Sequence, residues 1–168
     1  RRNRLYPNAE FLHSDVSNLS SISQKFDGYW SFGVIEHFIN GYDEIANQAN
    51  KVLNDEGYSF IIVPTMNYLS FLKKILNVYG KKEPEKNLFH QYILDFKHVK
   101  NVFEKNGFKY VEKHNMTGSL GASREISRPK IFTSRSKIKL MRGLWWALNP
   151  FLSSVTWHTS LVIFKKIQ

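Results

Sequence analysis

The sequence contains no cysteine, which removes several classes of protein at once. Disulfide scaffolds, thiolate zinc sites and cysteine nucleophiles are excluded, and the absence fits a reducing compartment. The six histidines show no His-Glu-x-x-His or similar ligand spacing, so we expect no metal. No Gly-x-Gly-x-x-Gly loop, Gly-x-x-x-x-Gly-Lys loop or Gly-x-Ser-x-Gly elbow occurs either. Functional groups must therefore be sought elsewhere, at the ends of strands.

Acidic side chains are scarce in the last third of the 168-residue chain, whose net charge is +10. Residues 1–108 carry 13 basic and 12 acidic side chains, whereas residues 109–168 carry 11 basic side chains and only Glu112 and Glu125. The basic character therefore belongs to the C-terminal third. Much of it lies in one stretch that precedes Trp145 and Trp146, and its members are Arg124, Arg128, Lys130, Arg135, Lys137, Lys139 and Arg142.

This basic stretch predicts contact with an anionic partner, such as a phosphorylated or lipid-linked substrate or the membrane surface. A peripheral membrane contact through residues 124–152 is favoured over nucleic acid, because no aromatic-interleaved recognition motif appears. A solvated loop without any partner is the alternative. Residues 143–164 carry no Lys, Arg, Asp or Glu, but nine of these 22 residues are Gly, Asn, Pro, Ser, Thr or His. A helix followed by a strand is therefore favoured over a membrane span, with an interfacial helix between the two.

Strands and helices alternate along the rest of the chain. Apolar runs predict strands, and stripes at helical spacing predict helices between them. Asp95 is a plausible N-cap of the third helix and Gly107 its left-handed C-cap. This order predicts a doubly wound α/β sheet. The predicted strands are 10–14, 29–35, 58–63, 108–111 and 160–164, and the predicted helices are 45–53, 69–79 and 96–103.

Polar or small residues follow the first two predicted strands, where open parallel sheets bind their ligands. Asp15 could accept hydrogen bonds from an amino group, and Gly33 would let a ligand approach the backbone. Equally, Asp15 could cap a turn with Ser17 and Asn18, and Gly33 could ease packing. From the residues alone, the ligand-binding and the structural interpretation of Asp15 and Gly33 are equally supported.

Four segments shift that balance, because their order resembles the class I S-adenosylmethionine-dependent methyltransferases. Residues 11–16 and 26–38 (FLHSDV and FDGYWSFGVIEHF) are similar to the family's Asp after the third strand and its "FD…VLEH" fourth strand. Residues 51–58 (KVLNDEGY) resemble its turn into the fifth strand, although Asn54-Asp55-Glu56 departs from the usual Lys-Pro-Gly. Residues 92–110 are similar to its last helix and the strand after it. The resemblance covers most of residues 5–113 and the closing strand.

The resemblance implies a Rossmann-like doubly wound sheet, incomplete at its N-terminal side, with an antiparallel final strand. It also implies S-adenosyl-L-methionine as cofactor. Asp15 would face the adenine amine, Val16 the adenine ring, and Ser31, Phe32 and Gly33 the methionine end. His37 would lie near the transferred methyl group as a catalytic candidate. Phe32 could instead be a core residue and His37 an exposed helix-start residue.

The family's glycine-rich loop and ribose-binding acidic residue would precede Arg1, so we expect a chain that begins mid-protein. We expect it to bind S-adenosylmethionine weakly or not at all, to be inactive alone, and to leave two sheet edges unpaired. The expected parts are a partial methyltransferase-like core (1–115), a basic, Trp-containing insertion (116–158) and the final strand (159–168).

The predicted function is methyl transfer to a small-molecule or lipid-linked acceptor, with a cytoplasmic location and an optional membrane contact. In similar methyltransferases the segment before the last helix folds over the active site. The resemblance therefore offers His90 as a catalytic candidate and Tyr92 as a substrate contact. Ordinary surface packing of these residues is the alternative. A Glu36–His37 metal pair is discounted, because adjacent helix residues do not share a face. The alternative function is a non-catalytic module that binds membrane or nucleic acid through its basic third.

Overall fold

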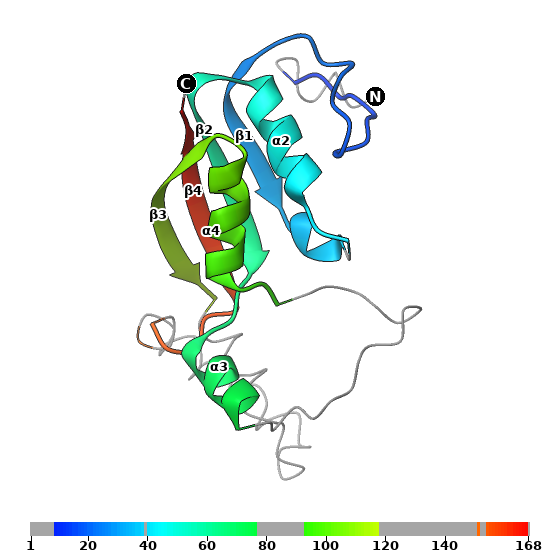
Figure 1. The fold of residues 1–168 in the computed structure, drawn as a ribbon. Coiled ribbons are helices and arrows are strands. Elements are labelled where there is room, and N and C mark those ends of the chain that lie inside the picture. Colours follow the sequence, from blue (N-terminus) through cyan, green and yellow to red (C-terminus); the bar gives the residue numbers. More distant parts are fainter. Residues whose placement is uncertain (1–8, 39, 77–92, 118–150, 152–153, 168) are drawn as a thin grey trace.

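The computed structural model describes residues 9–38, 40–76, 93–117, 151 and 154–167. These residues form a four-stranded sheet with helices beside it (Figure 1). In chain order the elements are β1 (Phe26–Phe32), the 3₁₀ turn η1 (Ile35–His37), α2 (Asp43–Val52), β2 (Leu53–Pro64), α3 (Tyr68–Ile75), α4 (Phe96–Lys105), β3 (Phe108–Met116) and β4 (Thr159–Lys166).

The sheet has the strand order β1-β2-β4-β3 and mixes both strand directions. β1 pairs with β2 in parallel, with Trp30 opposite Phe60. β4 lies between β2 and β3 and is antiparallel to both, with Ile61 opposite Val162. The predicted strand–helix–strand order and the antiparallel final strand are therefore confirmed.

The core lies between the sheet and the helices α2 and α4. Ser59, Ile61 and Val63 alternate along β2 and are fully buried on the side of the helices, whereas Phe60 and Ile62 between them are only partly buried. The apolar run predicted burial on both faces, but β2 is covered mainly on one. From α4, Phe103 stacks on Phe164 of β4 with ring centroids 4.6 Å apart. Burial of these apolar side chains supplies the main drive for folding.

The ends of α4 follow the sequence prediction. The Asp95 side chain accepts a hydrogen bond from the Lys97 backbone N–H at 2.9 Å, which makes Asp95 the N-cap. Gly107 has a φ of +81°, the left-handed conformation that lets the chain turn from α4 into β3. Both local predictions are confirmed.

The predicted strand at 10–14 is wrong. In this segment Phe11 and Leu12 are more than half exposed, and no described strand pairs with it. A strand needs a neighbour to bond its backbone groups, and a short apolar segment does not supply one. The next strand is β1, which ends at Phe32 rather than at Ile35, because Gly33 turns the chain with a φ of +66° and η1 follows. α3 begins at Tyr68 and ends at Ile75; residues 77–79 of the predicted helix lie outside the described residues.

Among the described helices, α2 and α4 pack on the sheet and lie on the same face of it (Figure 1). On the opposite face Trp30 stacks on Phe60 at 4.3 Å and is 65% exposed. β1 and β3 form the two edges of the described sheet. β4 (Thr159–Lys166) supplies the predicted final strand, whereas the insertion at 116–158 falls mostly outside the described residues. Within the described part of the chain, no helix is long and apolar enough to cross a membrane.

Candidate functional site at the carboxyl end of β1

β1 ends in a buried hydroxyl followed by a glycine. The Ser31 side chain is 3% exposed, and no atom in the described part of the protein completes a hydrogen bond to its Oγ. Gly33, two residues later, has a φ of +66° and donates its backbone N–H to the Ile62 carbonyl at 2.9 Å. A side chain at position 33 would be strained in that conformation, so the backbone there stays open to close approach. Burying a hydroxyl without a hydrogen-bond partner destabilises the folded state by about 1–3 kcal/mol, so such a group in a native fold calls for an explanation.

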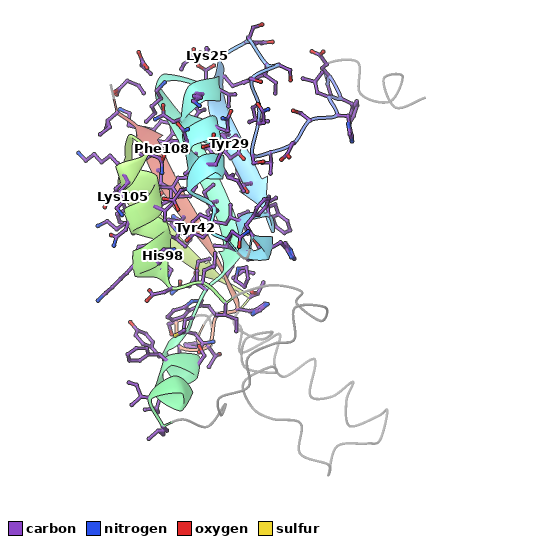
Figure 2. The ribbon with its side chains drawn as sticks, turned by 45° about the vertical axis from the view of Figure 1, so that its right-hand side comes forward. Lys25, Tyr29, Tyr42, His98, Lys105 and Phe108 are labelled. Carbon is purple, nitrogen blue, oxygen red and sulfur yellow. The ribbon has the colours of Figure 1, made fainter. Side chains whose placement is uncertain are left out.

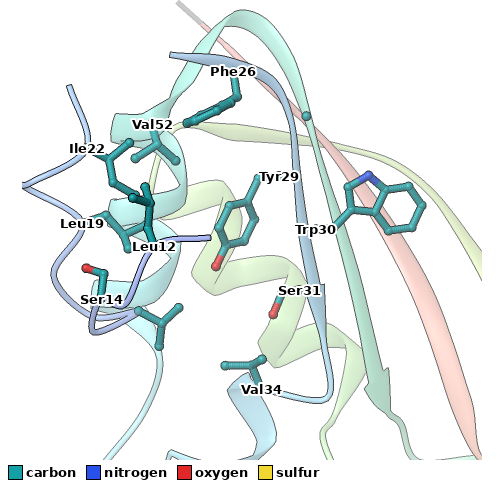
Figure 3. Close-up of a pocket in the computed structure, with 12 residues that line it drawn as sticks. Leu12, Ser14, Leu19, Ile22, Phe26, Tyr29, Trp30, Ser31, Val34 and Val52 are labelled. Carbon is teal, nitrogen blue, oxygen red and sulfur yellow. The ribbon is translucent and has the colours of Figure 1, made fainter. Parts of the chain in front are cut away.

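A cavity of about 430 Å³ lies beside this strand end (Figure 3). One wall is β1, from which Tyr29 and Ser31 point inward, while Trp30 points to the other side of the strand. The opposite wall is the segment before β1, through Leu12 and Leu19. A mainly apolar wall with a few polar groups is typical of sites that bind small organic ligands.

The polar groups of this cavity are the hydroxyls of Ser14, Tyr29 and Ser31. Burial raises the pKa of Tyr29, and the nearby Ser31 hydroxyl offsets part of that rise. Tyr29 is therefore a neutral hydrogen-bonding group at physiological pH. The sequence reading missed it, because Tyr29 appears there only as one apolar residue in a strand.

Asp15 and Val16 lie in the turn that precedes Leu19. Asp15 Oδ1 accepts hydrogen bonds from the Ser17 backbone N–H at 2.9 Å and the Ser17 hydroxyl at 2.7 Å, and these bonds lower the pKa of the exposed Asp15 carboxyl. Val16 lines the cavity. The structure thus shows the turn-capping contacts of Asp15, and its role toward adenine stays a prediction.

Two of the remaining predicted residues, Phe32 and His37, follow Ser31 closely in the chain. Phe32 is 76% exposed and, by the alternation of a strand, lies on the face opposite to Ser31, so it is not a core residue. His37 ends η1 and its side chain is exposed. His90 and Tyr92 lie outside the described residues. The structure therefore brings Val16 and Ser31 into one cavity, with Gly33 beside them.

Glu36, considered from the sequence only in a discounted metal pair with His37, is a further buried group. Its side chain is 3% exposed, and Oε2 makes no hydrogen bond within the described part of the chain. Burial raises the pKa of this carboxyl, while its hydrogen bond to its own backbone and the adjacent His37 lower it in part. Oε1 lies 3.5 Å from the point where a Cβ on Gly33 would be placed. No three His, Cys, Asp or Glu side chains of the described residues gather as metal ligands.

Comparisons with known proteins were made for the sequence and for the fold. No protein-family profile and no curated protein sequence matches the chain. Among solved structures, a protein assigned as a sarcosine dimethylglycine methyltransferase from Galdieria sulphuraria superposes with a TM-score of 0.56 and 16% identity, over 99% of this chain and 62% of that one. A SAM-dependent methyltransferase from Archaeoglobus fulgidus gives 0.56 and 18% identity, over 96% of this chain and 69% of that one. The [4+2]-cyclase SpnF also gives 0.56, with 10% identity over 99% of this chain and 60% of that one.

The chain therefore has the fold of class I S-adenosylmethionine-dependent methyltransferases, a Rossmann-like open α/β sheet, and the resemblance of its sequence is confirmed at that level. It spans about three-fifths of the length of the structure from Galdieria sulphuraria. Sequence identities of 10–18% carry the likeness no further than the fold. SpnF has a similar fold but is named as a [4+2]-cyclase, not as a methyltransferase. Function must therefore be argued from the site.

Proposed function

We propose that this chain takes part in S-adenosylmethionine-dependent methyl transfer to a small-molecule or lipid-linked acceptor. The proposal concerns a portion of such an enzyme, since the chain spans 62% of the structure from Galdieria sulphuraria. The observation that carries it is the buried, unpartnered Ser31 hydroxyl, which faces a cavity at the carboxyl end of β1 beside Gly33. That strand end is where open α/β sheets bind their ligands.

The residues present fit the cofactor in three respects. The cavity of about 430 Å³ is lined by Val16 and Tyr29 and has mainly apolar walls. The Ser31 hydroxyl lies in the cavity wall beside Tyr29 and makes no hydrogen bond of full geometry within the described residues, so it offers a donor or an acceptor to a ligand. The positive φ of Gly33 keeps the backbone after β1 free of a side chain. When bound, the cofactor supplies a sulfonium methyl group for transfer.

The roles of the chain's own residues follow from this placement. Val16 and Tyr29 would hold the adenine ring, and Asp15 would accept from its amine. Ser31 and Gly33, with Phe32 in between, would position the methionine end. Transfer from a sulfonium is an in-line displacement, so holding both reactants in line contributes much of the rate. His37, at the end of η1, remains a candidate for contact with the acceptor, as do His90 and Tyr92.

Two buried serines provide a matched test of the cofactor site. Ser31 and Ser59 both lack a hydrogen-bond partner within the described residues, but only Ser31 lines the cavity. We expect Ser31→Ala to weaken binding of S-adenosylhomocysteine by about 3- to 10-fold, the worth of one hydrogen bond. Ser59→Ala should leave binding unchanged, and both variants should keep or gain stability, because each removes an unpaired buried hydroxyl.

The measurement is an NMR titration of the full 168-residue chain with S-adenosylhomocysteine, because weak binding is expected. Amide shifts should concentrate at Val16, Ser31 and Gly33. Equal affinities of the Ser31→Ala and Ser59→Ala variants would overturn the assignment of the site. Tight, micromolar binding would contradict the expectation that this chain alone holds the cofactor weakly.

The basic segment supports the lipid-linked part of the proposal. Residues 109–168 carry a net charge of +9, from 11 basic and two acidic side chains. Positive charge next to Trp145 and Trp146 suits an anionic interface. We expect the chain to float with liposomes that contain anionic lipid, with a shift in tryptophan fluorescence, and not with neutral liposomes. Unshifted fluorescence on anionic liposomes would remove the membrane contact, and a non-catalytic module that binds membrane through this segment would be removed with it.

A further inference from the structure

A second cavity, of about 310 Å³, lies where the N-terminal ends of α2 and α4 approach each other. Tyr42 and His98 face each other there (Figure 2). The cavity is lined in addition by Phe38, Gly41, Leu94 and Asp95. None of these residues belongs to the cavity beside β1, so the second cavity is a separate place for a ligand.

Its walls contain a buried hydroxyl without a partner. Tyr42 is 3% exposed, and its Oη makes no hydrogen bond within the described part of the chain. The ring itself is well held, because it meets the His98 ring edge to face at 5.6 Å. A rigid phenol that lacks a partner in a cavity wall offers one donor and one acceptor to a ligand.

Two carboxylates, those of Asp43 and Asp95, contribute negative charge at this wall. Burial raises the pKa of Tyr42, and the charges of Asp43 and Asp95 raise it further. The Asp43 Oδ2 lies 3.6 Å from the point where a Cβ on Gly41 would be placed, so this carboxylate stands beside the glycine wall. Asp95 contributes to the wall directly.

Positive charges near the cavity offset part of this field. Burial lowers the pKa of Lys113, and the negative charge of Asp95 offsets part of this. The Lys113 ammonium lies 4.8 Å from the ring centre of Phe96 and 4.7 Å from that of Trp157, and Lys113 does not line the cavity. The N-terminal ends of α2 and α4 contribute partial positive charges, which the carboxylates of Asp43 and Asp95 balance. The polar side chains that line the cavity are Tyr42, Asp95 and His98, so an anion would meet the carboxylate of Asp95 in the wall, with that of Asp43 beside Gly41.

We propose that this cavity binds the ammonium group of a small aliphatic amine. An ammonium N–H would donate to the Tyr42 Oη, and Asp43 and Asp95 would balance its charge. The rings of Phe38 and Tyr42 would cover the aliphatic part, with the cation near an aromatic face. The site needs no cofactor, so its test is independent of methyl transfer.

The test compares three ligands of the same size and different charge: propylammonium, 1-propanol and propionate. Each is titrated into the full chain carrying ¹³C-labelled tyrosine and histidine, and the ring signals of Tyr42 and His98 are followed by NMR. Propylammonium should bind saturably in the millimolar range, which suits so small a ligand. The alcohol and the carboxylate should bind at least about tenfold more weakly, since 1-propanol is neutral and the negative charge of propionate is repelled by the carboxylates. Equal binding of 1-propanol, or no saturable binding of propylammonium, would overturn the proposal.

Three variants separate binding from structure. Tyr42→Phe should weaken propylammonium binding about tenfold while the free energy of unfolding stays equal or rises, because an unpaired hydroxyl is removed. Asp95→Asn should weaken binding by several-fold and keep the N-cap, since Asn caps helices as well as Asp. Glu104→Gln, near the other end of α4, is the control and should change nothing. Unchanged affinity in both Tyr42→Phe and Asp95→Asn would contradict the site.

Discussion

The buried carboxyl of Glu36 makes the stability of this protein depend on pH in a defined direction. Its pKa is raised above the ordinary value of 4.5 by burial, so the folded protein holds this proton more tightly than the unfolded chain does. The stabilising contribution is complete below about 4.5 and is lost as the pH rises through the raised pKa. Glu36→Gln keeps the shape of the side chain and removes the titration.

The size of the effect follows from the burial and the unpaired oxygen. Glu36 is 3% exposed and its Oε2 makes no hydrogen bond in the described part of the chain, so the ionised form loses its hydration without replacement. An unpaired buried group of this kind destabilises by about 1–3 kcal/mol. We therefore expect Glu36→Gln to be about 1–3 kcal/mol more stable than the wild type at pH 7. At pH 4 the two proteins should differ by less than about 0.5 kcal/mol, because the wild-type carboxyl is then neutral.

The assay is urea unfolding followed by tryptophan fluorescence between pH 4 and pH 8. Urea is preferred because guanidinium chloride would screen charges. Asp27→Asn, on the exposed part of β1, is a control that should show no such pH-dependent gain. A stability difference between Glu36→Gln and the wild type that stays constant over this range would refute the reasoning, since no titration would then be involved.

Three further substitutions test the packing. Gly107→Ala should destabilise by about 2 kcal/mol in urea unfolding, because φ is +81° and the new Cβ would lie 2.7 Å from Asn50 Nδ2; a neutral result would contradict it. Phe103→Ala should lower the free energy of unfolding by about 3–5 kcal/mol, since the ring is fully buried against Phe164, and a loss below 1 kcal/mol would refute that. Asn67→Ala should speed amide exchange in α3, whose first turn it caps at 2.8 Å.

Local signals in the sequence predicted much of the fold. Asp95 and Gly107 mark the ends of α4 by chemistry that acts within a few residues, and the structure keeps both. The consecutive apolar residues of β2 predicted a strand buried on both faces of a parallel sheet; β2 is a strand, but its burial alternates and its partner β4 is antiparallel. These features depend on nearby residues or on one strong pattern, which is why they could be read in advance.

Features that depend on distant contacts could not be read in this way. Residues 10–14 have a strand pattern but no partner strand in the described part of the chain, and pairing is not encoded within the segment. The burial of Glu36 and Tyr42 arises from packing between elements, so the sequence did not predict it for either residue. Of the candidate site, the sequence placed Val16, Ser31 and Gly33 together through the family resemblance, and it missed Tyr29, which faces them in the cavity.

The central claim is that the cavity between the segment before β1 and β1 itself holds S-adenosylmethionine. The most direct measurement is ultraviolet crosslinking of the 168-residue chain with S-adenosylmethionine labelled in its methyl group, followed by peptide mapping. The account predicts label in peptides from residues 9–34, reduced by excess S-adenosylhomocysteine and not by excess ATP. Label confined to other peptides, or label that S-adenosylhomocysteine does not reduce, would contradict it.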